Sequence, residues 1–589
     1  MKKIKSFIVL ATIGATLAGC DDFLDDNRYP PTKILNTPEY WSNTNNCQLQ
    51  VDRFADEIIN PYGTGGGTGT FFYSTLNDDQ VGSSFADWSY TTVPATNSNW
   101  SYTTIRGVNY IINGVRNAQP ALSEVNHKNF EGIARMIRAY TYYKLVRNFG
   151  DVVWESEVVD PSDVDVLYGP RTNRDIVMDS VMADLNYAIA AISAESSKTS
   201  WSKDLARCMK SEIALYEGTF CRYRTLAENN LAPDEARAKT YLQYALDASK
   251  QILDNSSYGF TDDYNSIYNS VWGGMDSPVD PDKKITDFNA VPEIIWGRRY
   301  DSVNGRHSLI SYTCSSTTTR GMSLDGFNSF LYLDGTPASA HTEAENVIGV
   351  ATTVDDKPAY YIGDRIALRD KRLGMITDPY VYYLGMTWAR AGATGMNASA
   401  GLGVSKYDNV LLAVKDRNMS AGNFTSAPIY WLSYIALNYA EAAAELGQFN
   451  DAVFNLALKP IYKRAGLDGV FTNAASLGNV NDSANNHGVT GTLWEIRRCR
   501  RCELMFDNNI RFYDLVRWHQ LDKLDSKKYP AVLQGAYVAN APVQPGSKVG
   551  NYCRPYAGTD RVFDKKYYLQ PIPSGQLDLN PALGQNFGW

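Results

Sequence analysis

The stretch Asn438-Tyr-Ala-Glu-Ala-Ala-Ala-Glu-Leu-Gly447, followed by Asn450-Asp-Ala-Val-Phe454, predicts two helices joined by a tight turn. Its alanines allow neighbouring helices to approach closely, and Gly447 can supply the left-handed conformation that ends many helices. Asn450 is suited to cap the next helix, because its side-chain oxygen can accept a hydrogen bond from a free backbone N–H group. The pattern indicates a tetratricopeptide-like hairpin, although the repeat consensus of roughly 34 residues does not recur.

Apolar residues recur at helical spacing in several further segments of the chain. The clearest stripes run over residues 133–143, 177–192, 242–253 and 432–446. Helix pairs of this kind stack so that neighbouring pairs bury a continuous core. The expected fold class is therefore mainly α, with tetratricopeptide-like hairpins forming a scaffold. Such a scaffold does not by itself indicate which ligand is bound.

Long stretches without helical periodicity separate the helical blocks. Residues 60–104 are rich in Gly, Ser, Thr, Asn and aromatic residues, and residues 256–430 hold many turn residues and short strand-like runs such as 293–300. Loops of this length are usually functional or disordered. The high aromatic content of the chain (Trp 12, Tyr 39, Phe 21) argues against disorder.

The N-terminus is typical of an exported lipoprotein. Three lysines precede a short apolar run at residues 7–17, which falls short of the roughly 20 residues needed to cross a bilayer. The run ends in Leu17-Ala-Gly-Cys20, a lipobox-like pattern, so we expect residues 1–19 to be cleaved and acyl chains on Cys20 to anchor the protein. The alternative is a plain secretory signal with a chance cysteine. The acidic run in residues 21–26 resembles the signal that sends some lipoproteins to the outer face of the outer membrane.

Motifs of the common catalytic and cofactor sites do not occur in the sequence. It contains no P-loop, HExxH, GxSxG or EF-hand pattern, and its five histidines lie far apart. Cys499 and Cys502 lie within a helical pattern without a second cysteine pair, so we interpret them as buried structural residues. We expect no enzymatic activity, metal or cofactor. The pairs Asp78-Asp79 and Asp262-Asp263 leave a surface glycosidase open, but adjacent carboxylates point apart, and turn or capping roles are the simpler interpretation.

The charge of the chain bears on its partners. A formal net charge of −8 argues against a nucleic-acid or anionic-membrane binder. The arginine-rich segment 497–517 is therefore better interpreted as structure. Arg511, Asp514 and Arg517 are spaced three apart, which makes them neighbours on one helix face and predicts ion pairs among them.

The C-terminal hundred residues carry two ordered sequence blocks. Arg500-Arg-Cys-Glu-Leu-Met-Phe506 leads into Arg511-Phe-Tyr-Asp-Leu-Val-Arg-Trp518, and Tyr568-Leu-Gln-Pro-Ile-Pro573 is followed by Asn580-Pro-Ala-Leu-Gly-Gln-Asn586. These blocks resemble the ERRxELxFE…RFxDLxRW and LPIP…NPxLxQN patterns of the SusD/RagB family of outer-membrane lipoproteins. Further similarities extend over nearly the whole mature chain and lie at residues 138–151, 171–173, 440–447 and 464–466.

Two positions depart from the family pattern. Cys499 stands where the family usually has Glu, which puts one buried ion pair in doubt. Pro460 interrupts a helix that is normally unbroken, and this predicts a kink.

The resemblance implies a nutrient-capture protein on the cell surface. Members of the family cap a SusC-like TonB-dependent transporter, bind oligosaccharides or in some cases peptides, and pass them to the pore without catalysis. The implied location is the outer membrane, facing the exterior through the lipid anchor. The implied organisation is a single SusD-like domain over 20–589, with an N-terminal helical part (20–255) that includes the aromatic loop 60–104, a loop-rich ligand-binding region (256–430), and C-terminal hairpins with the family tail (431–589).

Candidate ligand contacts follow from what sugar binding requires, namely flat aromatic faces with polar neighbours. In the first irregular stretch these are Trp88 and Tyr90, near Asp79. The candidates in the second irregular stretch are Trp272, then Trp296 and Tyr300, which lie on a strand-like run, and Trp388 on a later loop. For each candidate, packing in the core is at least as good an explanation as ligand contact.

Overall fold

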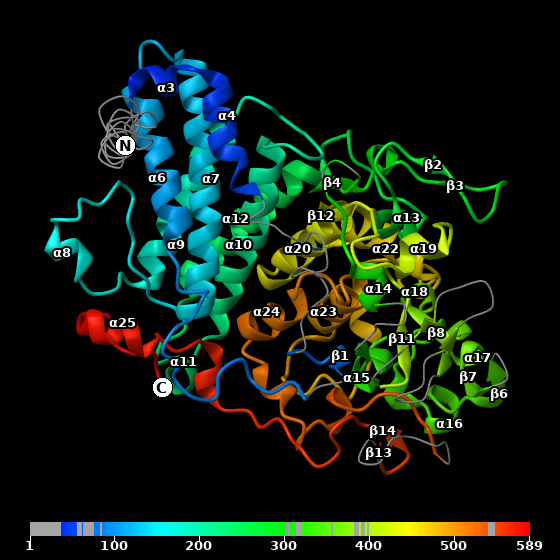
Figure 1. Ribbon diagram of the computed structural model, residues 1–589. Helices are drawn as coiled ribbons and strands as arrows, with labels where there is room; N and C mark the ends of the chain where they lie inside the picture. Colours follow the sequence, from blue (N-terminus) through cyan, green and yellow to red (C-terminus); the bar gives the residue numbers. More distant parts are fainter. Residues whose placement is uncertain are drawn as a thin grey trace, which may run out of the picture.

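The computed structural model describes residues 37–55, 62, 76–82, 85–301, 303, 305–313, 320–354, 357–381, 388–389, 395–396, 400–539 and 548–589. Within these ranges the fold is mainly helical, as the sequence predicts (Figure 1). The longer helices are α4 (Thr44–Asp52), α6 (Thr103–Asn117), α7 (Glu124–Phe149), α9 (Arg174–Ala191), α10 (Lys203–Tyr223), α12 (Glu235–Leu253), α20 (Leu432–Glu445), α22 (Lys459–Ala465), α23 (Gly491–Glu503) and α24 (Ile510–Arg517).

Shorter elements fill the spaces between the long helices. The short helices are α3 (Pro38–Ser42), α8 (Val164–Leu167), α11 (Leu226–Asn229), α13 (Tyr264–Asn269), α14 (Leu309–Thr313), α15 (Leu324–Asn328), α16 (Glu343–Asn346), α17 (Gly363–Ala367), α18 (Lys371–Ile376), α19 (Val414–Asn418), α21 (Asp451–Val453) and α25 (Ser574–Leu579). The strands are β1 (Gln80–Gly82), β2 (Met275–Asp276), β3 (Lys284–Ile285), β4 (Ile294–Arg298), β5 (Arg320–Met322), β6 (Val350–Val354), β7 (Lys357–Tyr361), β8 (Thr377–Val381), β9 (Trp388–Ala389), β10 (Gly395–Met396), β11 (Leu402–Val404), β12 (Ala427–Trp431), β13 (Lys548–Val549) and β14 (Tyr552–Cys553).

The long helices form a stack of neighbouring antiparallel pairs. α7 packs against α6 and α9, while α12 packs against α10 and α20. Their apolar faces belong to one large buried cluster, so the scaffold has a single continuous core among the described residues. Each of the four stripes seen in the sequence lies within or at the end of one of these helices, namely α7, α9, α12 and α20.

The predicted hairpin after residue 438 is confirmed in detail. α20 ends at Glu445, and Gly447 adopts a left-handed φ of 70°. Asn450 caps α21, because its Oδ1 accepts hydrogen bonds from the backbone N–H groups of Ala452 and Val453. The glycine and the asparagine thus do what their backbone preferences favour.

Pro460 is accommodated without ending its helical segment. α21 continues through a π-helical turn (Phe454–Leu458) directly into α22, where Pro460 lies in the first turn. The N–H group of Lys459 bonds to the carbonyl of Phe454, five residues earlier. Proline has no N–H group to donate, and the wider π turn absorbs the resulting mismatch with the α-helical ladder.

The region from residue 256 to 430 contains short strands and helices joined by turns. Its largest sheet has the strand order β11-β8-β7-β6 and lies apart from the long helices (Figure 1). β4 confirms the strand expected near residues 293–300, and it pairs antiparallel with β12 at the start of α20. This pairing ties the beginning of the region to its end.

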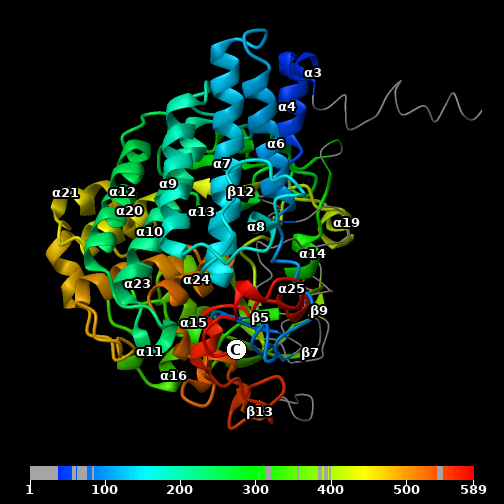
Figure 2. The same ribbon diagram turned by 90° about the vertical axis from the view of Figure 1, so that its left-hand side faces the viewer.

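The C-terminal segment lies at the C-terminal end of α7 (Figure 2). Gln570 donates its backbone N–H group to the carbonyl of Asn148 in α7, and Ser574 donates to the carbonyl of Pro94. The family tail therefore fastens the aromatic segment around residue 90 to the helical stack.

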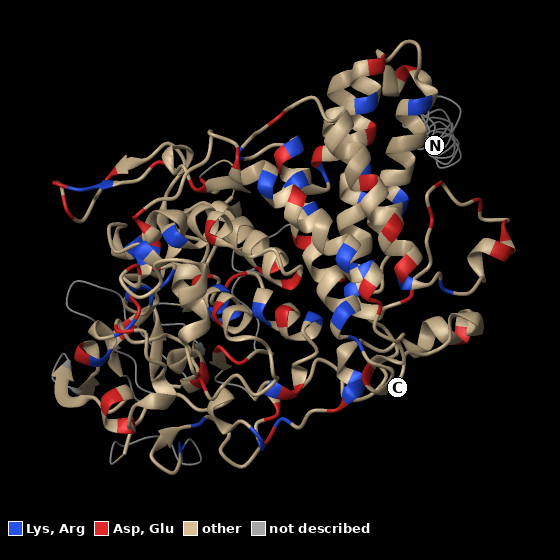
Figure 3. Cartoon of the chain, turned by 180° about the vertical axis from the view of Figure 1, so that it is seen from behind, with Lys and Arg blue, Asp and Glu red and all other residues tan. Residues whose placement is uncertain are grey.

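The arginines of α23 and α24 are buried or half-buried and all form ion pairs, as the structural interpretation predicts. Arg517 pairs with Glu441 of α20 and with Asp514, and Arg500 pairs with the other oxygen of Asp514. Acidic and basic positions are interspersed over the chain when the molecule is seen from behind (Figure 3). Because carboxylates pair with the arginines of α23 and α24, these helices do not offer the basic patch that nucleic-acid binding requires.

Two expectations about charged residues are wrong. Arg511 pairs with Asp78 at 2.7 Å, not with Asp514 on its own helix. Asp78 and Asp79 are not surface turn residues, because their exposed fractions are 1% and 0% and both carboxylates pair with Arg501. These ion pairs fix the segment before β1 against α23 and α24.

The lipobox lies outside the described residues, and so does the predicted acylation site Cys20. Within the described ranges, no helix is both long and apolar enough to span a membrane. Cys499 and Cys502 are buried free thiols, which agrees with their structural interpretation. The Sγ atom of Cys499 lies 3.7 Å from Nη1 of Arg372, whose charge is balanced by Asp370 and Glu503.

Candidate functional site

A cavity of about 630 Å³ opens where the end of α7, the middle of α10, the start of α24 and the C-terminal segment meet. The segment around residues 88–90 forms a further part of its wall. These elements are far apart in the sequence, so only the folded chain creates the cavity. Aromatic side chains dominate its lining: Trp88, Tyr90, Tyr140, Tyr143, Tyr216, Tyr434, Phe512, Tyr513, Tyr567, Tyr568 and Trp589.

Three of these rings form a connected aromatic wall. Trp88 stacks on Tyr567 with ring centroids 4.4 Å apart and planes inclined by 9°. Tyr567 meets Trp589 edge to face at 6.0 Å. The indole N–H group of Trp88 donates to the carbonyl of Val562 at 2.7 Å, which fixes its ring. Flat apolar faces beside polar groups suit the C–H face of a sugar ring.

A cationic group also lines the cavity. The guanidinium of Arg147, in the last turn of α7, is 3.4 Å from the ring centroid of Tyr513 and 4.9 Å from that of Tyr143. Asn148, the next residue, accepts a hydrogen bond from the Tyr513 hydroxyl at 3.3 Å. The cavity thus offers donors and acceptors as well as aromatic faces.

Two carboxyl groups also line the cavity, Glu212 and Asp514. Burial raises the pKa of Glu212, although a hydrogen bond from the Tyr430 hydroxyl at 2.6 Å and the charge of Arg147 oppose that rise. Asp514 has both oxygens engaged, one by Arg500 at 2.8 Å and the other by Arg517 at 2.9 Å. A carboxylate held by two guanidinium groups is poorly placed to act as a nucleophile or base.

The structure brings Trp88 and Tyr90 together in this cavity, whereas the other predicted contacts whose side chains are described lie elsewhere. Trp88 is 5% exposed, while Tyr90 is partly exposed. Trp272 lies in the loop before β2, where its ring packs near Phe288. The guanidinium carbon of Arg299 lies 4.8 Å from the centroid of the Trp272 ring.

The remaining predicted contacts are buried or not described. Trp296 in β4 is 5% exposed and donates its indole N–H group to the carbonyl of Ser200, and Tyr300 is fully buried. Asp79 is fully buried beside Arg501. The backbone of Trp388 lies in β9, but its side chain is outside the described part of the chain.

Sequence reasoning missed several cavity residues. Arg147, Tyr513 and Tyr567 all lie in or beside the segments that resemble the family pattern, yet nothing in their local sequence singles them out. Only the tertiary fold brings the end of α7 to the start of α24.

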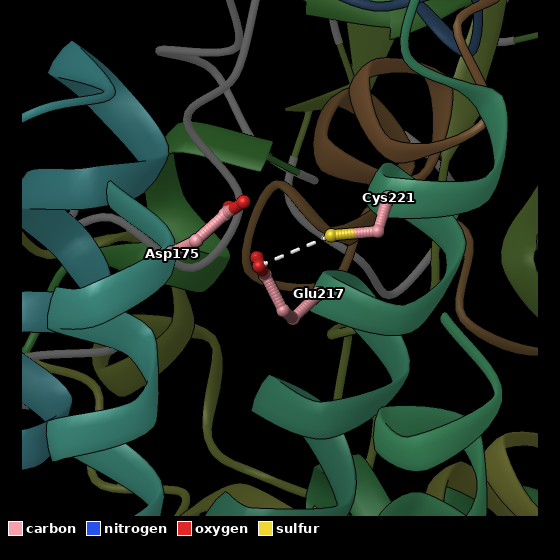
Figure 4. A group of neighbouring side chains, drawn as sticks. All are labelled: Asp175, Glu217 and Cys221. Carbon is pink, nitrogen blue, oxygen red and sulfur yellow. Dashed lines mark hydrogen bonds between the residues drawn. The ribbon is translucent and has the colours of Figure 1, made fainter. Parts of the chain in front are cut away.

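A second cluster of potential ligand atoms is formed by residues that do not line the cavity (Figure 4). The cluster consists of one carboxylate oxygen of Asp175, one of Glu217 and the Sγ atom of Cys221, which all lie within 4.8 Å of one another. Arg174 pairs with Glu217 at 2.5 Å, and Arg224 pairs with Asp175 at 2.9 Å. Burial raises the pKa of the Cys221 thiol, which donates to Glu217 at 3.2 Å. A protonated thiol and two guanidinium groups compensate the carboxylates, so this cluster is an internal ion-pair network.

Comparison with known proteins defines the family. The model of the SusD family matches residues 292–589, about half of the chain. The chain belongs to the SusD family. A second family model, described as starch-binding and associating with the outer membrane, matches residues 67–215 of this SusD-family protein.

Individual relatives agree with that membership. SusD-like protein P2 of Formosa agariphila is 27% identical over 305 residues, which cover 47% of this chain and 56% of that protein. The match therefore spans little more than half the length of this curated relative. Among solved structures, a SusD-like carbohydrate binding protein from Bacteroides fragilis aligns over 92% of this chain and 99% of its own, with a TM-score of 0.63 and 16% identity. Surface glycan-binding protein A from Bacteroides fluxus aligns over 93% and 100%, with a TM-score of 0.55 and 15% identity. At these identities the structural matches establish a shared SusD fold.

Proposed function

We propose that this SusD-family protein binds oligosaccharides in the cavity between α7, α10, α24 and the C-terminal segment, and that it releases them unaltered. The observation that carries the proposal is the aromatic wall of Trp88, Tyr567 and Trp589 in an open cavity of about 630 Å³. A pocket of this size accommodates a few sugar rings, and stacked aromatics bind sugars without any reacting group. Two proteins whose solved structures share this fold are named for carbohydrate or glycan binding.

The proposal includes delivery to a SusC-like TonB-dependent outer-membrane transporter. Lipid on Cys20 would hold the protein at the outer membrane, facing the exterior, and more than one acyl chain is needed for a stable anchor. The lipobox sequence and the second family description, which names association with the outer membrane, support this location. Co-purification with a large β-barrel protein in detergent tests the partnership, and recovery of the lipoprotein alone would count against it.

A non-catalytic role is the better-supported version of this function. Retaining glycosidases need two free carboxyl groups roughly 5 Å apart, and inverting ones need them somewhat further apart. In the cavity, Asp514 is held by Arg500 and Arg517, which leaves Glu212 as the carboxyl group without an arginine partner within hydrogen-bonding distance among the described residues.

Alanine substitutions on two surfaces test the site. We expect Tyr90→Ala and Tyr567→Ala to weaken oligosaccharide binding about tenfold or more, because stacking aromatics commonly dominate binding energy. Trp272→Ala is the matched control, since Trp272 is an aromatic on a loop outside the cavity. Isothermal titration with the best ligand from a glycan array, with a peptide pool as competitor, measures all three. Loss of affinity in Trp272→Ala alone would move the site to that loop, and competition by peptides would change the cargo.

A further inference from the structure

Arg147 lies close enough to Glu212 to feel its charge, but no acidic side chain among the described residues is in direct contact with its guanidinium. Within the described ranges it forms no ion pair, and its Nε atom is buried without a hydrogen-bond partner. The other two arginines of the cavity behave differently, since Arg500 and Arg517 both pair with Asp514. A buried donor without a partner is uncommon in folded proteins and calls for a ligand or a water molecule.

The position of Arg147 suits recognition of an anion. Its guanidinium lies over the ring of Tyr513 at 3.4 Å and near that of Tyr143 at 4.9 Å. Stacking on aromatic rings holds the group in place without using its N–H donors. Those donors form a rigid fork that matches the paired oxygens of a carboxylate or a sulfate.

The N-terminus of α24 also favours an anion in the cavity. Asn508, Asn509 and Ile510 line the cavity, and the first turn of α24 contains no acidic residue. Asn509 precedes the helix without a side-chain cap, and its Oδ1 atom is buried without a partner. A helix N-terminus favours negative charge, and the free amide oxygen can accept a hydrogen bond from a sugar hydroxyl.

The backbone before α24 is held in an uncommon conformation. Phe506, Asn508 and Asn509 all have positive φ, at 74°, 43° and 57°. Such conformations are uncommon for residues other than glycine and cluster at functional sites. Here they turn the chain so that α24 begins at the cavity.

Among the described lining residues, Glu212 is the carboxyl group without an arginine partner, so its charge opposes an anion there. Its carboxylate accepts a hydrogen bond from the Tyr430 hydroxyl, and burial raises its pKa. Glu212 thus already accepts a hydrogen bond from a hydroxyl group, and a sugar hydroxyl is a donor of the same kind. The other charged residues of the described lining are Lys144, Arg147 and the group formed by Asp514 with Arg500 and Arg517. In that group the carboxylate is paired with both arginines, so it does not repel an anion as a free carboxylate would.

We propose that the preferred cargo is an acidic oligosaccharide, and that Arg147 receives the carboxylate of a uronic acid or the sulfate ester of a sulfated sugar. This inference rests on the proposed function and names the chemistry of its ligand. Aromatic rings would hold the sugar faces, and the N-terminus of α24 would lie beside the acidic group.

The test begins with a glycan array that carries uronic-acid, sulfated and neutral oligosaccharides. The mature lipoprotein in detergent is expected to bind acidic members. The best ligand is then compared with its neutral counterpart, obtained by carboxyl reduction or by desulfation, in isothermal titration at low salt. We expect the acidic form to bind at least about tenfold more tightly, which corresponds to about 1.4 kcal/mol. Whether reduction or desulfation removes the preference distinguishes a carboxylate from a sulfate.

Variants assign the preference to Arg147. Arg147→Met keeps an apolar stem against the two tyrosines and should abolish the acidic preference, with little change for the neutral ligand. Arg147→Lys keeps the charge without the fork and should retain part of it. Arg106→Met is the control, since Arg106 lies over Tyr110 on α6, outside the cavity. Binding confined to neutral sugars, or an unchanged preference in a folded Arg147→Met protein, would overturn this inference but not the proposed function. Binding to no glycan at all would overturn both.

Discussion

Removal of the Arg517 side chain should expose how strongly the family's arginine block stabilises the fold. Arg517 is 2% exposed and donates two hydrogen bonds to Glu441, at 2.7 and 2.6 Å, and one to Asp514 at 2.9 Å. In Arg517→Met, the fully buried carboxylate of Glu441 loses its bidentate partner. Breaking a buried pair in this way costs about 3 to 5 kcal/mol.

The pKa of Glu441 gives an independent magnitude. Burial opposes ionisation, but the charge and hydrogen bonds of Arg517, helped by the charges of Arg497 and Arg500, outweigh it and lower the pKa from 4.5 to about 2. At about 1.4 kcal/mol for each unit, the difference amounts to about 3 kcal/mol. Because the folded-state pKa is depressed, this stabilisation is present above pH 4.5 and is lost as the pH falls from 4.5 towards 2.

Urea denaturation of the wild type and of Arg517→Met between pH 2.5 and pH 7 measures the effect. The difference in free energy of unfolding should be about 3 kcal/mol or more at pH 7 and should shrink at the acidic end. Glu441→Gln is the matched variant, since it removes the titrating group and should flatten the same part of the profile. A difference that stays constant over the whole pH range would refute the electrostatic reasoning.

Three further predictions concern separate parts of the molecule. Cys20→Ala should abolish incorporation of labelled palmitate and release the protein from membranes, whereas labelling that persists would exclude Cys20 as the acylation site. Burial raises the pKa of Asp507 from 3.8 to about 6 despite the neighbouring Lys406. The free energy of unfolding should therefore fall by about 3 kcal/mol as the pH rises from about 4 to 6 and Asp507 ionises. Asp507→Asn should remove this pH dependence from urea denaturation curves. Neither the wild type nor Glu212→Gln should release reducing ends from a bound polysaccharide; release that Glu212→Gln abolishes would favour a glycosidase.

Local patterns were sufficient to predict the helical scaffold. Gly447 and Asn450 fulfil backbone roles that depend only on their own conformational preferences, so the hairpin after residue 438 follows from a few residues of sequence. Asp263 likewise caps α13, as expected of an acidic residue before a helix. These features need no knowledge of distant partners.

Features that depend on distant contacts were not predictable in the same way. Asp78 has the local character of a turn residue, but it is buried because Arg511, more than four hundred positions later, pairs with it. Trp296 and Tyr300 are aromatic residues of the kind that contact sugars, but their side chains are buried in the core. The cavity combines Tyr90, from the first irregular stretch, with residues from the far end of the chain.

The most direct test of this account is a crystal structure of the mature chain bound to the oligosaccharide that it prefers. The account predicts sugar rings against Tyr90 and Tyr567, with an acidic substituent within hydrogen-bonding distance of Arg147. Sugar density on the Trp272 loop, with the cavity between α7 and α24 left to solvent, would contradict it.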